Sequence, residues 1–141
     1  MAITHDLSGK TAVITGSNSG IGLGIAKEMG KAGANLVLNS FTDSDEDHDL
    51  AAELSRSLGV DVTYIQADMS KAEDCRRLVV AAGGCDILVN NAGIQHVAAI
   101  QDFPIDKWNA IIAINLSSAF HTSAVAATGM RERGGGRIIN I

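Results

Sequence analysis

Short apolar runs and longer amphipathic stretches alternate along the chain. The apolar runs are bounded by turn residues and do not alternate strictly with polar residues, which is typical of strands covered on both faces. We predict strands at 11–15, 35–39, 60–65, 86–90 and 137–141. Helical stretches separate them, at 21–32, 49–58, 72–82 and 106–131, and glycines follow each one. This order predicts right-handed βαβ units and an α/β fold with a doubly wound parallel sheet.

The length of 141 residues suits one domain, 1–141, rather than two. The sequence stops inside the apolar run 137–141, whereas a parallel strand is normally followed by a helix that covers it. We therefore expect a Rossmann-like domain that is truncated after its fifth strand.

Composition narrows the class of protein. Hydrophobic residues make up 46% and charged residues 19%, which fits a chain with a buried core. The net charge of −5 argues against a nucleic-acid partner, and the uninterrupted apolar runs are too short for a membrane span. Cys75 and Cys85 form no CxxC pair, so we expect reduced, buried packing residues and a cytoplasmic protein.

A glycine-rich turn follows the first strand and opens the first helix. It consists of Thr15, Gly16, Ser17, Asn18, Ser19, Gly20, Ile21 and Gly22. Gly16 permits a sharp exit from the strand, Gly20 lets a diphosphate approach the backbone, and Gly22 allows the helix to pack closely. The free N–H groups of the helix N-terminus would then bind the anion. The alternative is a glycine turn without a ligand; a GxxxxGK[ST] phosphate loop is excluded because no lysine follows.

Together with Asn90-Asn91-Ala92-Gly93 at the end of the fourth strand, this turn resembles the short-chain dehydrogenase/reductase family. The resemblance extends from Leu7 to Ile141. It implies a seven-stranded sheet, a nicotinamide dinucleotide cofactor, and cofactor contacts from the turn and from Asn91, Ala92 and Gly93. It also implies assembly into a homotetramer through the long helix 106–131.

The residues after the second strand discriminate between the two nicotinamide cofactors. A 2′-phosphate needs a nearby arginine or lysine, and neither occurs at 17–19 or 39–43. The loop is instead acidic, so NAD is favoured over NADP, although no acid stands directly at the strand end. By resemblance, Phe41, Asp68 and Met69 also contact the cofactor, Asp68 through the adenine amino group; the alternative for Asp68 is an acid in a helix-capping turn.

The acidic run has two further interpretations. Asp43, Asp45, Asp47 and Asp49 follow the spacing of the first half of a calcium loop, but His48 and Leu54 occupy positions that need Gly and Glu. We therefore expect a solvated loop whose carboxylates favour the N-terminus of the next helix.

The resemblance also implies the chemistry, which is hydride transfer supported by an Asn, a Ser, a Tyr and a Lys. Asn115 matches the Asn, which anchors a water relay; satisfaction of its amide by a backbone carbonyl is an alternative that is compatible with this role. The Ser is expected just beyond Ile141, and the only tyrosine, Tyr64, has no lysine four residues later. We therefore do not expect these 141 residues to catalyse the reaction on their own.

The segment around Gln95 indicates the substrate. It resembles the branch of the family that acts on 3-hydroxybutyrate, where a Gln at this position binds the carboxylate of the hydroxy or oxo acid. A 3-oxoacyl thioester or a sugar substrate, and a non-catalytic nucleotide-binding fragment, remain as alternatives. Trp108 is expected to be a core or interface anchor.

Overall fold

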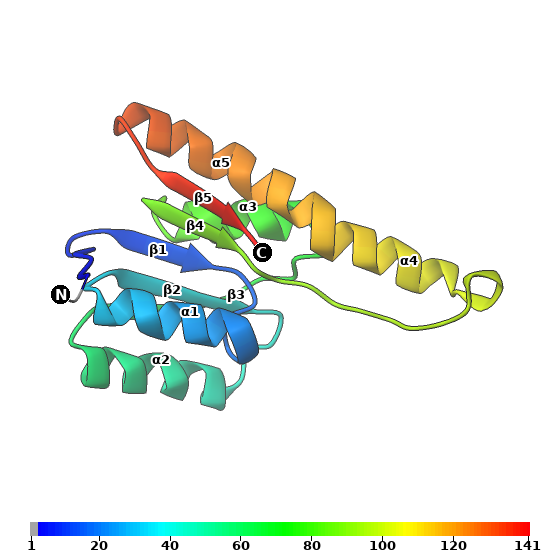
Figure 1. Ribbon diagram of the computed structural model, residues 1–141, viewed down its shortest axis with the longest axis horizontal. Coiled ribbons are helices and arrows are strands. Elements are labelled where there is room, and N and C mark those ends of the chain that lie inside the picture. The colour runs from blue at the N-terminus through cyan, green and yellow to red at the C-terminus, as the bar shows by residue number, and fades with distance from the viewer. Residues whose placement is uncertain (1–2) are drawn as a thin grey trace.

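A computed structural model describes residues 3–141 and consists of three layers, with a parallel sheet between two layers of helices (Figure 1). The strands are β1 (Thr11–Ile14), β2 (Asn35–Ser40), β3 (Val62–Gln66), β4 (Ile87–Asn90) and β5 (Arg137–Asn140). The helices are α1 (Gly20–Lys31), α2 (Asp45–Leu58), α3 (Ala72–Ala81), the 3₁₀ turn η1 (Ile100–Asp102), α4 (Ile105–Ile112), the π-helical turn η2 (Ala113–Ser117) and α5 (Ser118–Glu132).

The strand order is β3-β2-β1-β4-β5, and every neighbouring pair is parallel. This arrangement confirms the predicted doubly wound sheet of five strands. The chain order reverses between β1 and β4, and open α/β sheets bind their ligands outside the carboxyl ends of the strands at such a point.

Two hydrophobic cores lie on opposite faces of the sheet. Along β1, Ala12 and Ile14 pack into the core beneath α1 and α2, whereas Val13 packs into the core beneath α3 and α5. Because every second residue meets a different helical layer, the strand is apolar throughout, as the sequence pattern indicated. Cys75 and Cys85 are buried in the second core as predicted, and burial raises the pKa of each thiol to about 11.

Helix α2 begins at Asp45, four residues before the predicted start at Asp49. Ser44 caps the helix: its hydroxyl accepts from the backbone N–H of Asp47, whose carboxylate accepts from the backbone N–H of Ser44. This reciprocal capping box satisfies N–H groups that the helix cannot pair internally. The expected solvated acidic loop is therefore wrong for 45–49, which lie in the helix.

The predicted single helix 106–131 is interrupted by η2, where i→i+5 hydrogen bonding inserts an extra residue into the turn. Helix α4 and the loop before it project beyond the sheet (Figure 1), and Trp108 on α4 is 55% exposed. Of its two predicted roles, the core anchor is therefore wrong, and the interface anchor stays a prediction. The span Ile105–Glu132 is long and apolar enough to cross a membrane. One such helix is weak evidence for a membrane span, and its second part, α5, packs against α3 and β4.

Candidate active site

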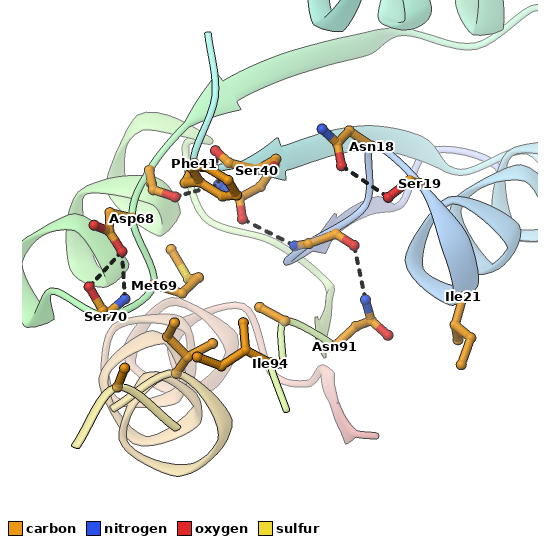
Figure 2. Close-up of a pocket in the computed structure, with 17 residues that line it drawn as sticks. Asn18, Ser19, Ile21, Ser40, Phe41, Asp68, Met69, Ser70, Asn91 and Ile94 are labelled. Carbon is orange, nitrogen blue, oxygen red and sulfur yellow. Dashed lines mark hydrogen bonds between the residues drawn. The ribbon is translucent and has the colours of Figure 1, made fainter. Parts of the chain in front are cut away.

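A cavity of about 620 Å³ opens at the carboxyl ends of β1, β2 and β4, at the reversal of the strand order. The glycine turn forms one wall, and the segments that follow β2, β3 and β4 form the others (Figure 2). The lining residues are Gly16, Asn18, Ser19, Ile21, Asn39, Ser40, Phe41, Ala67, Asp68, Met69, Ser70, Asn91, Ala92, Gly93, Ile94, Ala110 and Ile114.

The backbone N–H groups of the turn divide into two sets. Those of Gly16 and Ser17 are not free: they donate to the side-chain oxygen and the backbone oxygen of Asn39, at 3.2 and 2.7 Å. The first-turn N–H groups of α1, at 20–22, have no acceptor among the described residues, and the N-cap Ser19 makes no capping bond with its side chain. The N–H groups available to an anion are therefore those of the helix start, and those of Gly16 and Ser17 are not available.

Two glycines give the turn its shape. Gly20 has a φ of +59°, which favours glycine, and a Cβ at this position would meet nothing within 4 Å. A Cβ on Gly22 would lie 2.3 Å from the carbonyl oxygen of Gly16 and 2.5 Å from the Asn91 amide nitrogen. Gly22 is therefore required for close packing, as the spacing predicted, whereas the approach of a diphosphate at Gly20 stays a prediction.

Asn39, which the sequence analysis did not select, supports the turn from the end of β2. Its side chain is fully buried, and its amide nitrogen donates to the backbone oxygens of Ser40, Ile65 and Ala67, at 3.3, 3.0 and 3.3 Å. Its backbone N–H donates to the Ser17 hydroxyl, 2.9 Å away. The side chain therefore joins three loops of the site. It lines the cavity, but its polar atoms are already bonded within the protein.

Asn91 braces the opposite side of the turn. Its amide nitrogen donates to the backbone oxygens of Thr15 and Gly16, at 3.1 and 3.0 Å. The Thr15 hydroxyl in turn accepts from the backbone N–H groups of Asn91 and Ala92. The two sequence motifs are thus bonded to each other, and Asn91 holds the shape of the turn from within the lining.

Asp68 and Met69 lie at the end of β3 and line the cavity, with Phe41 across from them (Figure 2). One oxygen of Asp68 accepts from the hydroxyl and the backbone N–H of Ser70, and these bonds lower the pKa of Asp68. The other carboxylate oxygen has no hydrogen bond among the described residues, so it can accept from an amino group in the cavity. Both interpretations of Asp68, the capping acid and the adenine contact, are compatible with this geometry.

Asp47 is buried, which the sequence analysis also missed. One oxygen accepts from the Asn18 amide at 3.0 Å; the other accepts from the hydroxyls of Thr42 and Ser44, at 2.8 and 2.9 Å. Burial raises the pKa of this carboxyl, but the hydrogen bonds together outweigh burial and lower it well below its ordinary value.

Asn115 lies in η2, and its side chain bonds to the segment that follows β4. Its oxygen accepts from the N–H of Ile94 and its nitrogen donates to the backbone oxygen of Ile94, both at 2.8 Å. The expected hydrogen bond between the Asn115 amide and a backbone carbonyl is confirmed, and the catalytic role of Asn115 stays a prediction.

Gln95 is exposed and does not line the cavity, so its substrate role also stays a prediction.

Most residues predicted to bind the cofactor line the cavity. Four do not: Thr15, Ser17, Gly20 and Gly22, which shape the turn from behind or at its outer surface. Asn39, Ser40 and the apolar Ile94, Ala110 and Ile114 line it without having been predicted. Within residues 3–141, no group of three or more His, Cys, Asp or Glu side chains could hold a metal ion.

Comparison with known proteins decides the family. The family model for short chain dehydrogenases matches residues 10–141. The chain belongs to this family. It is 55% identical over 140 residues to the D-beta-hydroxybutyrate dehydrogenase of Cupriavidus necator and 50% identical over 136 residues to that of Rhizobium meliloti. These matches cover 96% and 94% of this chain and 53% of each relative, so the chain spans about half the length of the curated relatives it matches.

The fold agrees with this assignment. The L-sorbose reductase of Gluconobacter frateurii, solved in complex with NADPH and L-sorbose, superposes with a TM-score of 0.92 at 38% identity. That match covers 98% of this chain and 54% of the reductase. The likeness therefore extends over nearly all of this chain and about half of the reductase.

Proposed function

We propose that this chain supplies the cofactor-binding portion of an NAD-dependent oxidoreductase that interconverts 3-hydroxybutyrate and acetoacetate. The observation that carries the cofactor part is the open helix start at Gly20, with unpaired N–H groups beside a cavity at the point of strand reversal. The substrate part is supported by the 55% identity to a D-beta-hydroxybutyrate dehydrogenase.

The residues present fit a dinucleotide. The first turn of α1 would bind the pyrophosphate, Asp68 would accept from the adenine amino group, and Phe41 and Met69 would pack against the adenosine. The segment from Asn91 to Ile94 and the side chain of Ile114 line the far part of the cavity, towards which the nicotinamide would extend. The cofactor supplies the hydride acceptor; Asn115 would hold the Ile94 backbone in place and Gln95 would donate to the substrate carboxylate.

We infer NAD rather than NADP. No lysine or arginine lines the cavity in the described part of the chain, and the loop after β2 together with the first turn of α2 carries several carboxylates. The L-sorbose reductase is described with NADPH, so likeness of fold does not choose between the cofactors. The same likeness favours a sugar reductase as the second candidate function. The higher identity to the hydroxybutyrate enzymes argues against it.

We further propose a cytoplasmic homotetramer, supported by reduced buried cysteines and by exposed apolar residues such as Leu116 and Phe120.

A chimera tests the substrate. Residues 1–141 are joined to the carboxyl-terminal remainder of the C. necator enzyme, where the family pattern places Ser, Tyr and Lys, and NAD⁺ reduction is followed. We expect turnover of 3-hydroxybutyrate by the chimera and none by the 141 residues alone.

In the chimera, replacement of Gln95 by Ala should raise KM for the acid about tenfold, because it removes a hydrogen-bond donor to the carboxylate. Gln101→Ala, at another exposed position, should leave KM unchanged. Turnover of a sugar without turnover of the acid would contradict the proposal.

A further inference from the structure

The buried carboxylate of Asp47 contacts the glycine turn through the side chain of Asn18. Asp47 lies in the first turn of α2 and is only 6% exposed, yet no cationic side chain pairs with it among residues 3–141. It is held by neutral donors alone, from the glycine turn on one side and from the loop 42–44 on the other. Its negative charge is therefore not cancelled by a partner.

This contact fixes the orientation of the Asn18 amide. A carboxylate only accepts hydrogen bonds, so the Asn18 nitrogen must face Asp47. The Asn18 oxygen then faces the other way, on the side of the Ser19 hydroxyl, as Figure 2 shows. Since Asn18 and Ser19 both line the cavity, the turn presents an oxygen acceptor and a hydroxyl there, and no fixed amide donor.

Asn18 lines the same cavity as Asn39 and Ser40 at the end of β2. In dinucleotide-binding folds an acid about 20 residues after the first glycine of the turn accepts from the ribose 2′-hydroxyl. Here that region holds Ser40 and Asn39, and the Asn39 amide already donates its hydrogen bonds to backbone oxygens. The missing negative charge is supplied instead from the first turn of α2, by Asp47, and it reaches the cavity through Asn18.

We propose that Asp47 sets the cofactor specificity of this site by holding the Asn18 oxygen as an acceptor for an unphosphorylated adenosine ribose. A ribose hydroxyl can donate to that oxygen, whereas a 2′-phosphate would meet an acceptor backed by a buried negative charge and would be repelled. Asp47 acts through Asn18 and is a positioning residue. The inference rests on the proposed function, because it presumes that the cavity binds a nicotinamide dinucleotide. The lowered pKa of Asp47 is consistent with it, since the group stays charged at neutral pH.

The test compares dissociation constants for NAD⁺ and NADP⁺, measured by calorimetry on the 141-residue chain. Asp47→Asn removes the charge at nearly constant shape, and the ratio of the NADP⁺ to the NAD⁺ constant should fall about tenfold. Asp45→Asn is the matched control: it removes the same charge from the same helical turn, but Asp45 is exposed and does not contact Asn18. Its ratio should stay within about twofold of the original. A merely structural role would weaken both cofactors equally and leave the ratio unchanged.

A second variant keeps the test decisive if Asp47→Asn does not fold. Asn18→Ala removes the oriented oxygen at a half-buried site and should also lower the ratio. In the Asn18→Ala background, Asp47→Asn should change the ratio less than it does alone, because the two residues act as one unit. If the chain binds NAD⁺ but neither variant changes the ratio of the two dissociation constants, the role of Asp47 is overturned and the proposed function is not. Failure of the unaltered chain to bind either nucleotide would overturn the proposed function itself.

Discussion

At the scale of single residues, the site depends on buried amides whose partners are distant in the sequence. Asn39 joins the glycine turn to the loops after β2 and β3 through its side chain, and Asn91 joins the same turn to β4. A buried amide that loses its partners costs more than the hydrogen bonds contribute when made. These two residues therefore stabilise the domain as well as shape the cavity.

Replacement of Asn39 by Ala tests this role. It strips Gly16 of its side-chain acceptor and leaves the backbone oxygens of Ile65 and Ala67 without the Asn39 donor in a buried setting. We expect the free energy of unfolding, measured by urea denaturation, to fall by about 3 kcal/mol. Asn109→Ala, at an exposed position on α4, should change it by less than about 0.5 kcal/mol. Equal effects of the two substitutions would show that Asn39 does not hold the loops together.

The supporting role of Asn39 could not be predicted from the sequence. Its acceptors are backbone oxygens of Ile65 and Ala67, and every residue type carries such an oxygen. Asp47 was readable in part: Ser44 followed three residues later by an acid is a capping pattern. Its burial was not readable, because it depends on Asn18, which is brought near only by the sheet. The sharp turn at Gly16 and the close packing at Gly22 were predicted correctly, since the glycine spacing reports a local backbone requirement.

At the scale of elements, the turn between β1 and α1 is the most constrained segment. Its first half is bonded to β2 and β4 by backbone and amide groups, and its second half starts the helix with N–H groups unpaired. The strands and most helices were predictable because each is a local pattern of apolar residues. The π-helical turn at 113–117 was not, since the insertion of one residue leaves the apolar pattern of the long helix almost unchanged.

Two glycines on α1 offer a matched pair of substitutions. Gly22→Ala would force a methyl group against the Gly16 carbonyl oxygen, so we expect a loss of about 2 kcal/mol in unfolding free energy. Gly24→Ala, two residues along the same helix with open space around it, should instead stabilise the chain by up to about 1 kcal/mol. Thermal and urea denaturation measure both. Tolerance of Ala at 22 would mean that the turn is not packed as described.

At the scale of the whole molecule, exposed apolar side chains lie in two regions, and Ile21 and Phe41 belong to the lining of the cavity itself. The cavity lies at the carboxyl edge of the sheet, while exposed apolar side chains gather on α4, on η2 and α5, and along β5, where Ile138 and Ile139 are 38% and 40% exposed. The sequence predicted a strand at 137–141, which the structure has at Arg137–Asn140. It did not predict the projection of α4, which depends on packing rather than on any local pattern.

The central claim is that the helix start at residues 20–22 binds the pyrophosphate of a nicotinamide dinucleotide. Backbone amide resonances of the ¹⁵N-labelled chain, recorded while NAD⁺ is added, test it most directly. The account predicts saturable shifts that are largest for Gly20, Ile21 and Gly22, with those of Gly16 and Ser17 smaller because Asn39 already holds their N–H groups. Absence of any shift at 20–22 in the folded chain, or shifts confined to the opposite edge of the sheet, would contradict it.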